Sequence, residues 1–137
     1  QNAICGTYYM TCFEYILFFR KGKDKPINLF SSKDIISMPV HKMKDENGNN
    51  IHDTEKPVEL MEYLILNSSK EGETVFDPFC GIGSTMIAAI RNGRKAIGCE
   101  IDERFASVAG SRLSYQLKTM ENLVEGRMNT GGQVELF

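Results

Sequence analysis

Apolar residues recur at regular spacings only from about residue 55 onward, where they alternate between helical and strand patterns. In chain order, the periodic segments are a helix from 56–57 to 67–69, a strand at 74–77, a helix at 84–92, a strand at 95–101 and a long helix after Asp102. Gly93 is placed to stop the second helix. This order predicts two parallel strands joined by a right-handed helical crossover, and therefore an α/β fold.

The amphipathic spacing of two helices also predicts which side chains point inward. In the first helix these are Val58, Met61, Leu64 and Ile65. In the third helix they are Phe105, Val108, Ala109 and Leu113. Asp102 directly precedes the third helix and suits its N-cap.

The first half of the chain is less regular. Aromatic and β-branched residues at 7–20 predict one or two strands, which we interpret as an N-terminal β-hairpin. Residues 27–53 show no sustained period, and Asn47–Gly48 suits the tip of a turn. After Glu121 the periodicity fades. The chain therefore divides into a hairpin segment, a loop that is a candidate for target recognition, an α/β unit and a flexible tail, at residues 1–30, 31–53, 54–120 and 121–137.

Composition is that of an ordinary globular domain, with 137 residues, 42% hydrophobic and 25% charged positions and a net charge of −2. No apolar run reaches the ~18–20 residues of a membrane span, and the N-terminus carries no secretory pattern. Four cysteines without a Cys-x-x-Cys pair and two histidines argue against a zinc site. We expect reduced, mostly buried cysteines in a cytoplasmic protein. Because the first residue is not Met, we also expect a part of a longer or processed chain.

The most informative stretch is residues 74–85, where an apolar run ends in Asp77 and continues through Gly81 and Gly83 into a helix. Such a turn lies at the carboxyl ends of the strands, where α/β sheets bind ligands. The glycines allow close backbone approach, and the helix start offers unpaired N–H donors. The acid at the strand end favours a ligand with a cation or hydroxyls over a bare phosphate.

Two further features converge on this turn. Glu100 ends the next strand, 17 residues after Gly83, where an acid reaches the ribose hydroxyls of adenosine in dinucleotide-type folds. Lys56, at the start of the first helix, is placed to pair with a carboxylate. A ligand with adenosine at one end and an amino-acid carboxylate at the other is S-adenosylmethionine. Each feature alone has a plainer explanation: Gly-x-Gly turns are common, strand-end acids often cap helices (a role for which Asp102 competes), and Lys56 could be a solvated lysine.

Three segments resemble the DNA amino-methyltransferases, which modify the exocyclic amino group of adenine or cytosine. They are His52-Asp-Thr-Glu-Lys-Pro-Val-Glu-Leu60, Phe76-Asp-Pro-Phe-Cys-Gly-Ile-Gly-Ser-Thr85 and Gly98-Cys-Glu-Ile-Asp102. The match is to the permuted members, whose cofactor motifs follow the catalytic ones, and it implies an incomplete Rossmann-like fold that binds S-adenosylmethionine. The cofactor-binding residues that the resemblance implies are Thr54, Lys56, Asp77, Phe79, Gly81, Gly83, Ser84, Thr85, Glu100 and Ile101.

The catalytic signature of that family, an acid or Ser followed by Pro-Pro and an aromatic residue, is missing from this sequence. The four prolines are Pro26, Pro39, Pro57 and Pro78. In the family, that motif holds the flipped target base. We therefore assign no catalytic residue and expect the C-terminal part of a DNA methyltransferase of the restriction–modification kind, inactive alone.

Two other functions remain open. One is a non-catalytic module that binds S-adenosylmethionine or DNA and acts through a partner. The other is a different Rossmann-type nucleotide enzyme, which the Asp-Pro-Phe sequence before the glycines disfavours.

The sequence also suggests partners. Basic residues between 20 and 33 could contact DNA phosphates or form a solvated lysine turn. Gln133, Leu136 and Phe137 resemble the peptides that dock on bacterial sliding clamps, or else they belong to a frayed end. Strands missing from the fold would leave sheet edges open, so we expect self-association, pairing with an absent N-terminal half, or closure of the hairpin onto strand 74–77.

Overall fold

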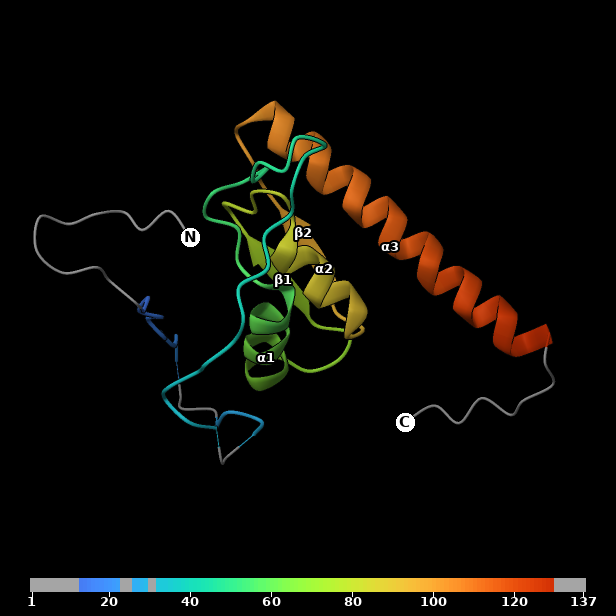
Figure 1. The fold of residues 1–137 in the computed structure, drawn as a ribbon. Helices are drawn as coiled ribbons and strands as arrows, with labels where there is room; N and C mark the ends of the chain where they lie inside the picture. Colours follow the sequence, from blue (N-terminus) through green and yellow to red (C-terminus); the bar gives the residue numbers. More distant parts are fainter. Residues whose placement is uncertain (1–12, 23–25, 30–31, 130–137) are drawn as a thin grey trace, which may run out of the picture.

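The computed structural model describes residues 13–22, 26–29 and 32–129, with side chains through residue 125. Its helices and strands, in chain order, are α1 (Val58–Ser68), β1 (Thr74–Asp77), α2 (Ser84–Arg91), β2 (Lys95–Gly98) and α3 (Glu103–Asn129), as drawn in Figure 1. The alternation of helices and strands confirms the predicted α/β class.

β1 and β2 form a parallel two-stranded sheet, and α2 is the crossover between them. The pairing ends where Asp77 meets Gly98, so β2 is shorter than the predicted strand at 95–101. The next N–H of this chain segment that could extend the ladder is that of Phe79, and it bonds to the Asp77 carboxylate instead. Two further backbone bonds lie at the carboxyl ends of the strands, from the N–H of Cys99 to the carbonyl of Asp77 at 3.0 Å and from the N–H of Cys80 to the carbonyl of Cys99 at 2.9 Å.

α1 and α2 bury one face of this strand pair. The core consists of Ile65, Ala88 and Ala89, against which Val58, Met61, Val75 and Ala96 pack. The inward face predicted for α1 is thereby confirmed. Strand alternation sends Phe76 and Ile97 to the opposite face, where their side chains are 59% and 54% exposed. Among the described residues, one face of the sheet is therefore covered and the other is open.

α3 begins at a cap and packs its first half against α2. The Asp102 carboxylate accepts the N–H of Arg104 at 2.9 Å, which confirms the predicted N-cap. The predicted inward side chains are buried or half-buried, namely Phe105, Val108, Ala109 and Leu113.

α3 also extends past its predicted end near Glu121 and continues to Asn129. Residues 121–129 contain no proline, and each residue added to an existing helix gains a hydrogen bond without a new nucleation step. Leu123 and Val124 are exposed there, which explains why the amphipathic pattern fades although the helix does not. This half runs beyond the strand pair (Figure 1). The predicted tail is thus helical over 121–129, and its remainder lies outside the described residues.

The predicted N-terminal hairpin is not confirmed. Residues 13–22 contain no strand, and the side chains of Phe13 and Phe19 are exposed. An aromatic and β-branched run becomes a strand only where a partner strand takes up its N–H and C=O groups. Residues 7–12 lie outside the described part. The polar turn at 45–50 is confirmed by an isolated antiparallel bridge that closes it.

Within the described ranges, no helix is both long and apolar enough to cross a membrane. The same residues include no group of three or more His, Cys, Asp or Glu side chains that could hold a metal ion. Cys80 is half-buried and Cys99 is exposed, both as free thiols. The prediction of buried cysteines therefore fails for Cys99, which lies just past the end of β2.

Candidate functional site

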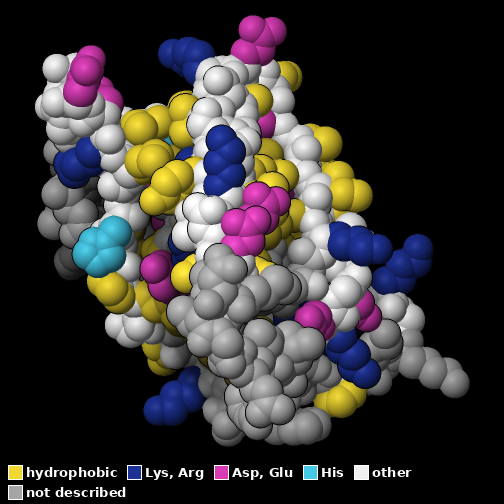
Figure 2. All heavy atoms as spheres, turned by 90° about the vertical axis from the view of Figure 1, so that its right-hand side faces the viewer, with side chains coloured by type: hydrophobic (Ala, Val, Ile, Leu, Met, Phe, Trp, Pro, Cys, Tyr) yellow, Lys and Arg dark blue, Asp and Glu magenta, His cyan; other side chains and the backbone are white. Residues whose placement is uncertain are grey.

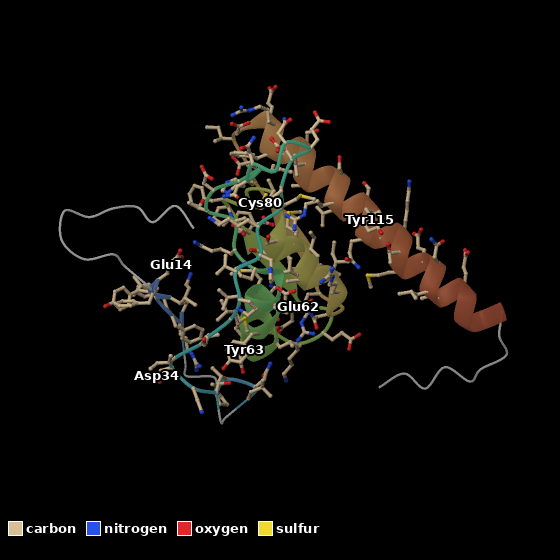
Figure 3. All side chains as sticks on the ribbon, viewed as in Figure 1. Glu14, Asp34, Glu62, Tyr63, Cys80 and Tyr115 are labelled. Carbon is tan, nitrogen blue, oxygen red and sulfur yellow. The ribbon has the colours of Figure 1, made fainter. Side chains whose placement is uncertain are left out.

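The glycine turn, residues 77–84, joins β1 to α2 and builds one wall of the site. The Asp77 carboxylate accepts the N–H of Phe79 at 3.0 Å, which reverses the chain after the strand. Gly83 is the N-cap of α2 and donates its N–H to the Cys80 carbonyl at 2.8 Å. The predicted strand, turn and helix start are thus all present, with Cys80 in the turn (Figure 3).

Both glycines of the turn are required by the backbone and by close neighbours. Gly81 has φ +53° and Gly83 has φ +86°, in the left-handed region that disfavours side chains. A Cβ on Gly83 would lie 3.2 Å from the Cβ of Ala109 in α3, and one on Gly81 would lie 3.3 Å from Nε2 of His52. The turn is therefore packed between α3 and the segment that precedes α1.

Glu100 ties the end of β2 to the glycine turn. Its Oε2 accepts the N–H of Gly81 and its Oε1 accepts the N–H of Asp102, both at 2.9 Å. These backbone bonds, that of Asp102 first, lower the pKa of Glu100 below its ordinary value of 4.5. The group is ionised at neutral pH, and each oxygen keeps acceptor capacity beyond the bond it makes.

A cavity of about 270 Å³ opens at the carboxyl ends of the two strands. Its lining, among the described residues, is Pro78, Phe79, Cys99, Glu100 and Ile101. Phe79 and Ile101 are 87% and 98% exposed, which is unusual for large apolar side chains. Two apolar walls and one carboxylate suit a flat ring that carries a hydroxylated sugar.

Lys56 and Thr54, both predicted to bind the cofactor, lie outside this lining. Lys56 Nζ is 2.6 Å from Oε2 of Glu14, in an ion pair whose two side chains are exposed; Glu14 is on the N-terminal segment (Figure 3). The Thr54 hydroxyl is 3.4 Å from Nδ1 of His52. His52 in turn contacts Phe105 of α3, edge to face, with ring centroids 4.4 Å apart. The structure therefore brings this segment beside the glycine turn but directs Lys56 to another partner.

Two hydroxyl residues of the predicted set begin α2. Ser84 is buried, and its Oγ has no hydrogen-bond partner among the described atoms, whereas Thr85 is half-buried. A buried hydroxyl without a partner is uncommon in folded proteins and calls for an explanation.

Burial, followed by the charges of Asp77 and Glu100, raises the pKa of the Cys80 thiol in the glycine turn, so Cys80 stays protonated at neutral pH.

The structure adds two residues that the sequence interpretation missed. Glu55 is buried and forms an ion pair with Arg112 of α3. One signal was available, because Arg112 continues the helical stripe of inward positions that includes Ala109. A charged residue on such a stripe requires a buried partner.

Comparison with known proteins identifies the family of this chain. A family model for N6 and N4 methyltransferases, described as DNA methylase, matches residues 2–111. The chain belongs to this DNA methylase family.

Individual relatives agree with this assignment. The chain is 40% identical over 84 residues to the type II methyltransferase M.HinfI of Haemophilus influenzae, and this match covers 61% of this chain and 23% of the relative. It is 32% identical over 130 residues to the type II methyltransferase M2.DpnII of Streptococcus pneumoniae, and this match covers 86% of this chain and 48% of that protein. The chain thus spans about a quarter to a half of these two relatives.

A solved structure supports the fold. The chain is 26% identical to M1.HpyAVI in its complex with S-adenosylmethionine, with a TM-score of 0.50 over 64% of this chain and 42% of that one. The two proteins therefore share the fold as well as sequence over this part of the chain.

Proposed function

We propose that this chain is the cofactor-binding part of a DNA amino-methyltransferase and binds S-adenosylmethionine at the carboxyl ends of β1 and β2. One observation carries the proposal: the Glu100 carboxylate bonds to the Gly81 N–H beside a cavity with two exposed apolar walls. A glycine turn, a strand-end acid and apolar walls match the parts of a nucleoside.

The residues present suit the two ends of this cofactor. At the adenosine end, Glu100 would accept the ribose hydroxyls, while Phe79 and Ile101 would pack against the base. At the methionine end, the N-terminus of α2 and the Ser84 hydroxyl, which lacks a partner among the described atoms, would receive the carboxylate.

Lys56 would join the methionine end by leaving Glu14. That exchange costs little, because exposed ion pairs contribute only about 0–1 kcal/mol. Thr54, on the same segment, would bind the methionine end together with Lys56.

Methyl transfer to DNA requires groups beyond this chain. S-adenosylmethionine supplies an activated methyl group on its sulfonium; the residues named here would bind and orient it and exclude water. The motif that holds the target base is missing from the 137 residues, so the amino group of adenine or cytosine would be presented by a further part of the enzyme. The open sheet face, with Phe76 and Ile97, suits that part or a second copy. Contact between DNA phosphates and the basic residues between 20 and 33 remains a prediction. So does clamp docking by Gln133, Leu136 and Phe137, which lie outside the described residues.

A second candidate function is a non-catalytic module that binds S-adenosylmethionine and acts through a partner. The observation that favours it is that the sequence contains the cofactor motifs and lacks the base-holding motif. Methyl transfer to DNA, assayed with and without a candidate partner subunit, separates the two.

The test of cofactor binding is calorimetric titration of the whole chain with S-adenosylmethionine and, separately, with NAD. We expect binding of the first alone. In Glu100→Gln the ribose hydroxyls lose an ionised acceptor, and the dissociation constant should rise at least tenfold, or about 1.4 kcal/mol.

The matched control is Glu71→Gln, which makes the same change at the opposite end of β1, where Glu71 is exposed. Its affinity should equal that of the unaltered chain. No binding by the unaltered chain, or equal affinity in the Glu100 variant, would contradict the proposal.

A further inference from the structure

Glu55 and Arg112 form a buried junction beside the glycine turn. Arg112 Nη1 lies 3.1 Å from Oε1 of Glu55, and the two side chains are 15% and 5% exposed. The same Nη1 donates to the carbonyl of Ile82 at 2.8 Å. The other carboxylate oxygen, Oε2, accepts the N–H of Met43 at 2.6 Å. One ion pair therefore connects α3, the glycine turn and two segments that precede α1.

The position of this junction is specific. Glu55 lies between Thr54 and Lys56, and Ile82 lies between Gly81 and Gly83. The pair therefore bridges the two segments that the proposed cofactor site requires, although neither charged group lines the cavity.

Stability alone does not account for a buried ion pair. Its desolvation cost offsets most of the Coulomb attraction, and apolar residues of similar volume often give equal or greater stability. Directed hydrogen bonds, unlike apolar contacts, fix the relative placement of the groups they join. Here two hydrogen bonds, from Arg112 to the Ile82 carbonyl and from the Met43 N–H to Glu55, flank the ion pair between Arg112 and Glu55.

We propose that Arg112 and Glu55 are positioning residues that hold the Thr54–Lys56 segment in register with the glycine turn, so that both ends of the cofactor are bound together. The inference rests on the proposed function as a cofactor site. It predicts that loss of the pair weakens cofactor affinity even where the chain stays folded.

The test uses the double variant Glu55→Gln/Arg112→Met in the whole chain. It leaves no unpaired charge in the interior, and the glutamine oxygen can accept the Met43 N–H, although more weakly than the carboxylate does, so the fold should persist while this bond opens more often. The dissociation constant for S-adenosylmethionine, measured by calorimetry well below the melting temperature, should rise at least tenfold. The control is Glu62→Gln/Arg91→Met, which makes the same chemical change at the half-exposed pair between α1 and α2 and should keep normal affinity.

A second measurement does not depend on the cofactor. Amide hydrogen exchange in the ligand-free chain should accelerate at least tenfold at Met43 and Gly83 in the first double variant, with little change at Ala88 in the core. Uniform acceleration, including Ala88, or a double variant that fails to fold would assign the pair to stability and overturn the proposal. Unchanged exchange, or normal affinity in the folded double variant, would also overturn it. If the unaltered chain does not bind the cofactor, the proposed function fails, and the exchange pattern still decides whether the pair couples the segments.

Discussion

Glu100 both connects two backbone segments of the candidate site and carries an ionised carboxylate beside the cavity. Its carboxylate accepts two backbone N–H groups, on Asp102 and Gly81, and these bonds lower its pKa. A depressed pKa in the folded state means that the ionised form stabilises the fold. That contribution is fully present above the ordinary value of 4.5 and is lost as the pH falls through the lower folded value.

The first prediction is a pH-dependent difference between the unaltered chain and Glu100→Gln. The urea midpoint of the unaltered chain should be higher by a constant amount at neutral pH, because the carboxylate is ionised in both the folded and the unfolded states. The difference should shrink as the pH falls below about 4.5. Urea titrations at a series of pH values measure it, and a difference that persists unchanged into acid would contradict the assignment.

The element that defines the site is the junction of β1 and α2. Gly83 combines a left-handed backbone with a close neighbour, since an added Cβ would lie only 3.2 Å from the Cβ of Ala109. Gly110, one residue further along α3, has nothing near its Cβ position and lies inside a helix. Replacement by alanine should therefore have opposite effects on stability at these two glycines.

We predict that Gly83→Ala lowers the free energy of unfolding by about 1–3 kcal/mol, because alanine is strained at positive φ. In contrast, Gly110→Ala should raise it by about 0.5–1 kcal/mol, because alanine loses less conformational freedom in a helix. Urea unfolding of both variants is the measurement. Equal stability of the Gly83 variant and the unaltered chain would mean that the turn tolerates another backbone conformation.

On the scale of the whole molecule, the main feature is incomplete coverage. The strand pair is packed on one face by α1 and α2, while Phe76 and Ile97 are exposed on the other. Hydrophobic side chains also remain visible on the face shown in Figure 2, around charged ones. A sheet with one uncovered apolar face is typically packed against a second layer.

We therefore predict that the chain self-associates through the open sheet face. Phe76→Lys should weaken the association at least tenfold in sedimentation equilibrium, while the free energy of unfolding changes by less than about 0.5 kcal/mol, since the position is exposed. Tyr115→Lys changes another exposed aromatic residue, on α3 (Figure 3), and serves as the control. An unaltered chain that is monomeric at all concentrations would contradict this prediction.

Local patterns alone determined much of this protein. The apolar spacing of α1, β1 and α2, the cap at Asp102 and the glycine turn depend on residues within a few positions of each other, so the sequence predicts them well. The motifs around Lys56, Asp77 and Glu100 are equally local, and the family that they resemble is the family to which the chain belongs.

Only the tertiary structure decided the rest, because those features depend on partners distant in the chain. Residues 13–20 form no strand despite their strand propensity, β2 pairs with β1 only as far as Gly98, and Lys56 forms an ion pair with Glu14. The Glu55–Arg112 junction joins two residues that lie far apart in the sequence. Burial and long-range pairing are properties of the folded chain, and no local spacing encodes which distant group a buried charge will meet.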